Sequence, residues 1–271
     1  MFYISIIFLV LIFLMRLTFP YFWNRYKRKQ RIKTALLLID DRGEEFDTWL
    51  TRYNRFYRNL NDLCKKRFLQ RSVEFMRSKE FIYYELEKDE KIALLVSAAA
   101  IQISFGLDCY MLDYFRKIHV LKTDYTYGEY NMPFMGHVDS NGIYFSWYNF
   151  LKGFEDPHDA NNVGLHEMAH ALAYVNFIAD ANGQDAKFKK RFTAFSKIAR
   201  PIFQSMTSGE TTVLDKYAAT DFQEFWAVSV ETFFERSREL KAKMPELYEA
   251  ISILLNLDPL SEQTILRGLP Q

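Results

Sequence analysis

The sequence predicts an α+β protein that is mainly helical, has a small sheet, and is preceded by one transmembrane helix. Three features support this fold class: an apolar run at the N-terminus, longer stretches with helical spacing, and short segments rich in aromatic and β-branched residues. The roughly 230 residues after the N-terminal segments are enough for one well-packed domain. We therefore divide the 271 residues into a transmembrane anchor at 1–24, a basic juxtamembrane linker at 25–45 and a domain at 46–271.

The N-terminal run predicts a membrane anchor. Residues 2–23 are almost wholly apolar, and about 20 residues cross a bilayer core. Arg16 lies near one end of the run, where a long side chain can reach the headgroups. Three consecutive aromatic residues, Tyr21, Phe22 and Trp23, are typical of a membrane interface. Charges follow the run instead of preceding it, and no small-residue cleavage site is present, so a secretory signal is disfavoured. A buried core helix is the alternative for this run.

Basic residues cluster directly after the apolar run. Residues 1–33 hold seven basic and no acidic residues, which leaves 28 basic and 34 acidic residues in the remainder, a net charge of −6. The positive-inside rule then predicts a single-pass protein of the inner (cytoplasmic) membrane with its domain in the cytoplasm. This basic collar can bind anionic lipid, whereas nothing indicates a nucleic-acid surface on the acidic domain. The collar consists of Arg25, Lys27, Arg28, Lys29, Arg31 and Lys33.

The domain is expected to alternate helices with short strands. Asn59 is expected to cap a helix, Gly106 to end a nearly apolar and therefore buried one, and Pro245 to open the last. These helices span 59–78, 91–105 and 245–255. Segments rich in aromatic and β-branched residues predict strands at 81–85, 117–122 and 142–147. Only Cys64 and Cys109 are present, too few for a disulfide framework and compatible with a reducing compartment.

One short motif carries metal chemistry. His166, Glu167 and His170 form the pattern H-E-x-x-H on a segment with helical spacing of apolar residues. Residues four apart share a helix face, so both imidazoles can bind one ion. Zinc binds nitrogen donors in a tetrahedron and leaves one position for water in a catalytic site, where Glu167 can accept a proton. The alternative is an ordinary pair of helical histidines, which the intervening glutamate disfavours. Asn161 or Asn162 is expected to cap this helix, and Asn182-Gly183 to follow it.

A third metal ligand is expected from a second helix. Glu224 lies 54 residues after His170 and follows a good N-cap at Thr220 or Asp221. Its carboxylate would complete a two-histidine, one-glutamate site for Zn²⁺. Glu231 shares the face of Glu224 and is free to hold a ligand histidine from behind, a role for which Asp221 is the second candidate. An exposed glutamate without a ligand role is the alternative.

These motifs resemble those of the Mlc titration factor A family of zinc metallopeptidases, also called glucose-regulated metallopeptidases. The resemblance runs from about residue 46 to residue 259 and is most specific at 165–170, 217–228 and 231–234. It implies a zincin-like fold and a possible protein partner, since better-known members bind a transcriptional repressor. For site residues it implies zinc ligands His166, His170 and Glu224, the catalytic base Glu167, and Tyr217 as a residue that stabilises the transition state.

Two classes of function follow from these features. The first is a membrane-anchored zinc peptidase that hydrolyses peptide bonds of a peptide or protein substrate with a zinc-bound water activated by Glu167. The second is a regulatory binding module of the same fold, which would sequester a partner such as a transcriptional regulator with little turnover. The intact Glu167 favours the first class, because a binding module has no need of a base.

Substrate binding is expected at the strand before the motif helix. An edge strand beside that helix can pair with an extended peptide through its free backbone groups. An interior strand is the alternative, because the segment is so apolar. His119, His137 and His158 have no partner at ligand spacing and are expected to be structural or exposed. The strand comprises Gly142, Ile143, Tyr144, Phe145, Ser146 and Trp147.

Overall fold

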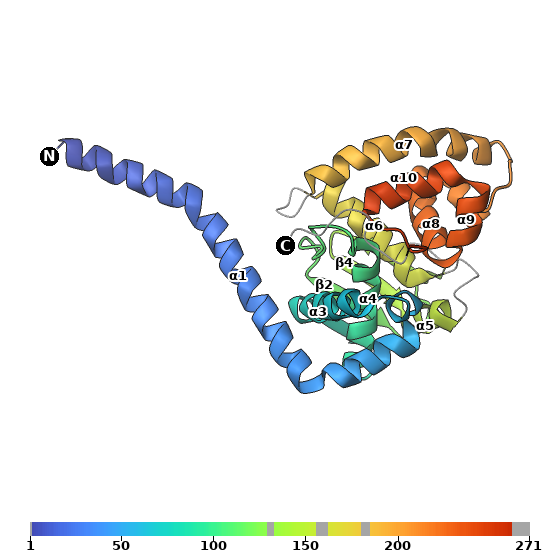
Figure 1. The fold of residues 1–271 in the computed structure, drawn as a ribbon, viewed down its shortest axis with the longest axis horizontal. Helices are drawn as coiled ribbons and strands as arrows, with labels where there is room; N and C mark the ends of the chain where they lie inside the picture. Colours follow the sequence, from blue (N-terminus) through green and yellow to red (C-terminus); the bar gives the residue numbers. More distant parts are fainter. Residues whose placement is uncertain (1, 129–132, 156–161, 180–184, 262–271) are drawn as a thin grey trace.

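Helices and one small sheet form the part of the protein that the computed structural model describes, residues 2–128, 133–155, 162–179 and 185–261 (Figure 1). This architecture is the mainly helical α+β arrangement that the sequence predicts. The helices are α1 (Phe2–Tyr53), α2 (Arg55–Arg58), α3 (Asp62–Ser78), α4 (Glu90–Ser104), α5 (Trp147–Glu155), α6 (Val163–Phe177), α7 (Ala186–Thr207), the 3₁₀ helix η1 (Lys216–Ala219), α8 (Phe222–Glu235), α9 (Ser237–Lys243) and α10 (Pro245–Leu255). The strands are β1 (Glu80–Tyr84), β2 (Lys117–Leu121), β3 (Gly136–Asp139) and β4 (Gly142–Ser146).

The sheet is mixed and has the strand order β1-β2-β4-β3. β1, β2 and β4 are parallel, whereas β3 and β4 form an antiparallel hairpin. The side chain of Asp139 closes the hairpin by accepting hydrogen bonds from the backbone N–H groups of Asn141 (2.8 Å) and Gly142 (3.1 Å). The three predicted strands are confirmed, and the ends of each observed strand lie within one residue of the predicted ends. β3 was not predicted, because four residues beginning with a glycine carry almost no alternating pattern.

The predicted edge position of 142–147 is wrong. β4 pairs with β2 on one side and with β3 on the other, so its backbone groups are already hydrogen-bonded within the sheet. Trp147, the last residue of the predicted strand, starts α5 instead. The segment is apolar because Ile143 and Phe145 are buried on the face of the sheet that packs against the core. A strand bonded on both sides cannot accept a peptide as a further strand.

The helices of the domain follow the predicted pattern, with one shifted start. α4 begins at the cap Asp89 and is buried along nearly its whole length, and α10 begins at Pro245 as predicted. α3 is capped by Asn61, whose side chain accepts from the N–H of Cys64 at 2.9 Å, so the prediction of Asn59 as the cap is wrong. Asn59 instead ends α2, where its N–H donates to the carbonyl of Arg55.

The core brings the motif helix against the sheet. α6 packs against β3, β4 and α4, and α8 packs against α6. Because successive strand residues point to opposite faces, the apolar residues of β2 and β4 lie together on the buried face. They are Ile118, Val120, Ile143 and Phe145. The sheet therefore supports α6 from one side while α8 approaches it from another.

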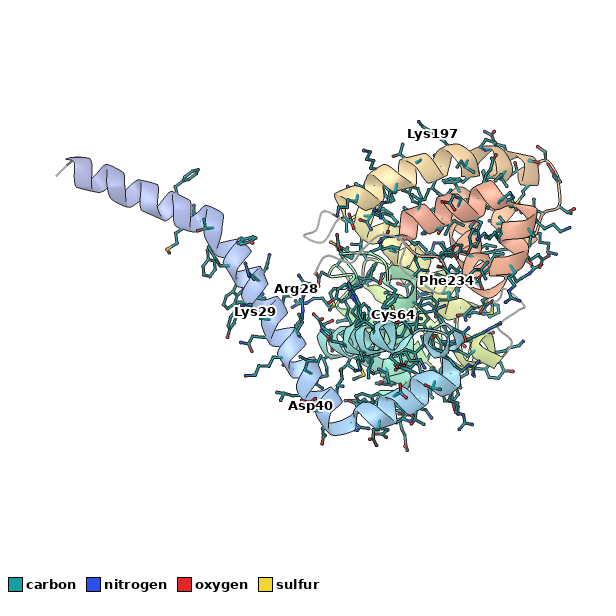
Figure 2. All side chains as sticks on the ribbon, in the orientation of Figure 1. Arg28, Lys29, Asp40, Cys64, Lys197 and Phe234 are labelled. Carbon is teal, nitrogen blue, oxygen red and sulfur yellow. The ribbon has the colours of Figure 1, made fainter. Side chains whose placement is uncertain are left out.

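Helix α1 extends away from the rest of the molecule at its N-terminal end (Figure 1). It is helical through 25–45, the stretch predicted as a linker, except for a kink at Arg42, and Arg28 and Lys29 lie along its projecting part (Figure 2). Arg42 has non-helical backbone angles, and the helix bends there before Phe46 and Leu50 enter the core. Ala35 is also buried, so packing of α1 onto the domain begins before residue 46.

In the part of the chain that the structure describes, no helix is both long enough and apolar enough to cross a bilayer. Most side chains of the predicted anchor at 2–23 lie outside the described residues.

Candidate metal centre

Helix α6 presents both histidines of the motif on one face. Asn162 caps the helix by accepting a hydrogen bond from the N–H of Leu165 at 3.0 Å, which selects it from the two predicted caps. Asn161 and the predicted exit at 182–183 lie outside the described residues. One turn separates His166 and His170, and their ring centroids are 4.8 Å apart. A helix start fixed by a side-chain cap thus sets the direction of both imidazoles.

Helix α8 supplies the third side chain. Its N-cap is Asp221, whose carboxylate accepts from the N–H groups of Gln223 (2.7 Å) and Glu224 (2.9 Å). Asp221 therefore holds the start of the helix that carries Glu224, and its described contacts do not include a ligand histidine, which differs from its predicted role. The indole N–H of Trp226 donates to the carbonyl of Ala169 at 2.9 Å. This hydrogen bond ties α8 to α6 beside the histidines.

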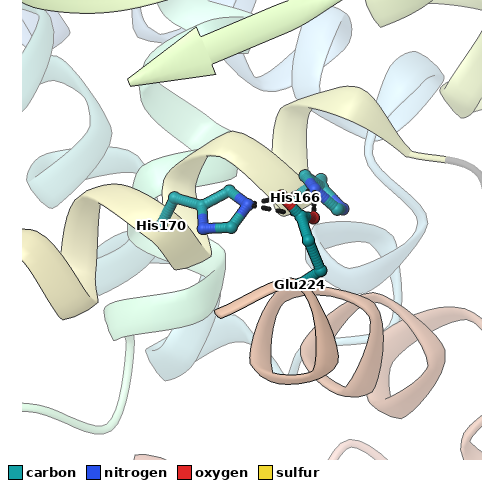
Figure 3. A group of neighbouring side chains, drawn as sticks. All are labelled: His166, His170 and Glu224. Carbon is teal, nitrogen blue, oxygen red and sulfur yellow. Dashed lines mark hydrogen bonds and ion pairs between the residues drawn. The ribbon is translucent and has the colours of Figure 1, made fainter. Parts of the chain in front are cut away.

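Three possible ligand atoms converge between the two helices (Figure 3). A carboxylate oxygen of Glu224, Oε2, lies 3.0 Å from His166 Nε2 and 3.4 Å from His170 Nε2. The two Nε2 atoms are 3.1 Å apart, so they can satisfy each other only if one of them carries a proton. A cation in their midst would be bound by all three groups. Two imidazole nitrogens and one carboxylate form a ligand set that fits zinc and leaves a position open.

A second carboxylate supports His166 from behind. Glu231 Oε2 lies 3.2 Å from His166 Nδ1, where the sequence predicted this glutamate, and its other oxygen accepts from the backbone N–H of Asn162. The side chain of Asn162 in turn donates to Glu235 at 2.9 Å. A partner on Nδ1 leaves Nε2 of His166 as the nitrogen that faces the cluster. Glu231 thereby fixes both the orientation and the tautomer of the ligand.

The charges within the cluster shift its pKa values in opposite directions. Burial alone would lower the pKa of His166, but the hydrogen bonds that its protonated ring donates to Glu224 and Glu231 outweigh it and raise the pKa to about 10. Burial would raise the pKa of Glu224, yet its hydrogen bonds with His166 and His170 lower it to about 2. His166 therefore retains a proton unless a cation takes its place, and metal binding would release that proton.

Glu167 lines the same cavity as the two histidines but is more deeply buried than they are. Its side chain is 6 % exposed, and burial raises its pKa to about 7 while the two histidines oppose the shift. Among the described residues its Oε2 has no hydrogen-bond partner. A Cβ atom at Gly136 would lie 2.6 Å from Glu167 Oε1, so only glycine allows β3 to come this close. The arrangement gives a carboxylate that can exchange a proton near neutral pH beside the metal ligands.

A cavity of about 430 Å³ opens onto these residues. Tyr217, in η1, lines it with a ring centroid 6.1 Å from that of His166, and it is 51 % exposed. β3 forms another wall through Gly136, His137 and Val138. The carbonyl of Met135 accepts from Ser146 of β4, so by alternation the backbone groups of Gly136 and Val138 point to the other side of β3. Sequence reasoning missed this strand, although the Asp139-to-Gly142 turn is a signal for a hairpin.

The remaining histidines belong to a stack of rings on the outer face of the sheet. Tyr144 lies between His119 and His137, with ring centroids 4.1 Å away on both sides. His137 also shares a hydrogen bond of 2.7 Å with the hydroxyl of Tyr125. Both histidines are thus held by packing, in keeping with the structural role predicted for them. His158 lies outside the described residues.

Two comparisons relate this sequence to known proteins. The sequence model of the family described as Glucose-regulated metallo-peptidase M90 matches residues 23–254, which contain α6 and α8 entirely. The chain is also similar to an uncharacterized protein of Synechocystis sp., with 25% identity over 223 residues, 76% of this chain and 81% of the relative.

Proposed function

The chain belongs to the glucose-regulated metallopeptidase family, and on this premise we propose that it hydrolyses peptide bonds with one zinc ion held by His166, His170 and Glu224. The observation that carries the proposal is the meeting of these three side chains next to Glu167 in one cavity. A zincin-like fold fits the same arrangement, because the motif helix lies against a small sheet whose edge strand lines the cavity. Zinc content of the purified protein, measured together with turnover of peptides, tests the proposal directly.

The chain's own groups account for the proton transfers. Zinc, when bound, supplies a Lewis acid that activates a water molecule and polarises the peptide carbonyl. Glu167, a buried carboxylate that lines the same cavity as the three ligands, accepts the proton of the attacking water and delivers it to the leaving amine. Glu231 keeps Nδ1 of His166 occupied, so that the imidazole stays oriented throughout.

The edge strand β3 is the proposed site of peptide backbone pairing, in place of β4. Gly136 and Val138 both line the cavity, and their backbone groups point away from β4. An extended peptide can add to such an edge through main-chain hydrogen bonds. Because Gly136 leaves room for Glu167, a peptide paired there would lie within reach of the base.

Tyr217→Phe is expected to lower kcat by about 100- to 1000-fold, the usual effect of removing one donor to a developing oxyanion. The hydroxyl belongs to a half-exposed side chain on the cavity wall, so its loss should change neither folding nor zinc content. Steady-state kinetics and elemental analysis measure the two effects separately. Tyr148→Phe is a matched control, because Tyr148 is exposed and is not among the described residues that line this cavity. Unchanged kcat in Tyr217→Phe would exclude the role.

Glu231→Gln is expected to weaken zinc binding by about 10- to 100-fold, the usual effect of changing a residue that hydrogen-bonds to a metal ligand. Glutamine keeps the shape of the side chain but removes the charge next to His166 Nδ1. Competition with a zinc chelator measures the affinity. Glu249→Gln serves as the control, because Glu249 is an exposed residue of α10. Equal affinities in the two variants would contradict the support given to His166.

We further propose that 2–23 anchors the protein in the inner membrane with the catalytic domain in the cytoplasm. α1 connects this stretch to the domain and is interrupted by the kink at Arg42. Trp23 stacks on both Phe19 and Tyr26 with centroid distances of 5.8 Å, and Lys27 lies over the Trp23 ring. Aromatic rings followed by basic side chains are typical of the cytoplasmic interface.

Exposed Cys109 allows a direct test of this orientation. A membrane-impermeant maleimide is expected to label Cys109 only after the cells are opened, whereas Cys109→Ser removes the signal. The protein should also stay with the membrane fraction after an alkaline carbonate wash. Labelling of Cys109 on intact cells would place the domain outside and refute the orientation.

A further inference from the structure

The face of α6 that carries the metal ligands continues as an apolar surface. Ala173, Tyr174 and Phe177 follow His170 at helical spacing and line the same cavity as the histidine. The helix extends past His170 in Figure 3. Seven further residues add about 10 Å of helix, so this surface reaches well beyond the metal ligands. Phe177 is 45 % exposed, although it is a large apolar residue beside a polar centre.

Aromatic side chains from two other helices pack beside Phe177 and extend this wall of the cavity. Phe192 of α7 lies 4.7 Å from Phe177, and Trp226 of α8 lies 5.5 Å from Phe192, as measured between ring centroids. Trp226 is 1 % exposed and is held by its hydrogen bond to the carbonyl of Ala169. Phe222 closes the wall next to Gln223. Because these rings pack on one another, the wall exists before any ligand arrives.

The residues of this wall disfavour a charged substrate side chain. Besides the metal ligands and Glu167, the described residues that line the cavity include no acidic or basic side chain apart from His137. His137 is stacked on Tyr144, and burial lowers its pKa, so it offers no cation to a substrate carboxylate at neutral pH. A charged side chain placed here would lose its hydration without gaining a partner. An apolar side chain would remove its own surface and that of Phe177 from water.

From this juxtaposition we infer that the cavity is a specificity subsite for a large apolar side chain, aromatic or aliphatic, next to the scissile bond. The inference rests on the proposed peptidase function and names its class of substrate. The cavity volume of about 430 Å³ lies within the range of ligand sites and accommodates a phenylalanine or leucine side chain beside the reacting bond. Ala173, a small residue on the turn after His170, leaves the space into which that side chain enters.

The test uses the zinc-loaded full chain and a peptide series that varies the residue on each side of the cleaved bond. Products identified by mass spectrometry give the cleavage position. At one of the two positions, phenylalanine or leucine is expected to raise kcat/KM by about 10- to 100-fold over aspartate or lysine. Calorimetric binding of the same peptides to Glu167→Gln gives a second readout that does not depend on turnover, and the order of Kd values should be the same.

Two substitutions in the cavity connect this preference to its wall. Ala173→Leu is expected to reduce kcat/KM for the phenylalanine peptide by about tenfold, and so to reduce its advantage over the aspartate peptide, because the leucine side chain fills the space. Phe177→Ala should weaken the preference without unfolding the protein, since Phe177 is half exposed. Tyr148→Ala is the matched control, an exposed aromatic on α5 that does not appear among the described lining residues.

The outcomes separate this inference from the function on which it rests. Cleavage of all peptides at similar rates, or a preference that Ala173→Leu leaves unchanged, would overturn the apolar subsite and leave the peptidase intact. If the fully zinc-loaded protein neither cleaves nor binds any peptide of the series, the proposed function itself falls. A preference for phenylalanine or leucine that Ala173→Leu abolishes and Tyr148→Ala retains supports the subsite.

Discussion

Glu224→Ala is expected to lower zinc affinity by more than about 100-fold. Changing a residue that only hydrogen-bonds to a metal ligand already lowers metal affinity by about 10- to 100-fold, so losing a ligand itself should cost more. Glu224 Oε2 lies within 3.4 Å of both imidazole Nε2 atoms, so its removal leaves two nitrogen donors and no charge to balance the cation. Zinc content after dialysis against a weak chelator measures the loss, and peptide turnover should disappear with the metal.

The matched control for this change is Glu249→Ala, an exposed glutamate in α10. It should retain one zinc per chain under the same dialysis. Far-ultraviolet circular dichroism shows whether each variant has kept its helices, since both substitutions lie in helices and alanine favours them. Full zinc occupancy in a folded Glu224→Ala variant would mean that this carboxylate is not a ligand.

Glu167→Gln is expected to retain zinc and to lower kcat by at least about 100-fold, the usual scale for losing a general base. The amide cannot accept the proton of the attacking water, whereas the three ligand side chains are unchanged. Burial raises the pKa of Glu167 to about 7, above its ordinary value. Ionising this buried carboxyl therefore lowers the free energy of unfolding as pH rises from about 4.5 through 7. Glutamine should therefore not lower the melting temperature at neutral pH.

This variant also distinguishes the two classes of function. A module that only sequesters a partner does not need a base, so Glu167→Gln would have the same partner affinity and the same residual activity as the wild type. A peptidase loses turnover and keeps peptide binding. Steady-state kinetics of wild type and variant at equal zinc content decide between these outcomes, and wild-type turnover in the variant would rule out the hydrolytic mechanism.

Features that depend on residues close together in the sequence could be predicted from the sequence. The pairing of His166 with His170 follows from helix geometry, and the start at Pro245 is local chemistry at a helix end. The sequence left Thr220 and Asp221 as candidate caps of α8, and the structure has Asp221. One prediction of this kind failed because two similar residues compete for the same role. Asn59 and Asn61 are both good caps, and the choice between them depends on where α2 ends.

Tertiary structure decided everything that depends on which distant segments meet. Glu224 lies far along the chain from His166, and only the packing of α8 on α6, with Trp226 bonded to Ala169, brings their atoms to 3.0 Å. Strand order belongs to the same class of property. The composition of 142–147 is equally compatible with an edge and with an interior position, so pairing with β2 and β3 had to decide it.

The sequence by itself therefore identified the candidate side chains of the metal site, two histidines and a glutamate on one helix and a carboxylate on another, because helical spacing and side-chain chemistry are local. The wall of the cavity did not follow from any local pattern. Phe177, Phe192 and Trp226 come from three helices and read individually as ordinary core residues. Only the close packing of α6, α7 and α8 places their rings beside the metal ligands, because side-chain packing is set by the whole fold.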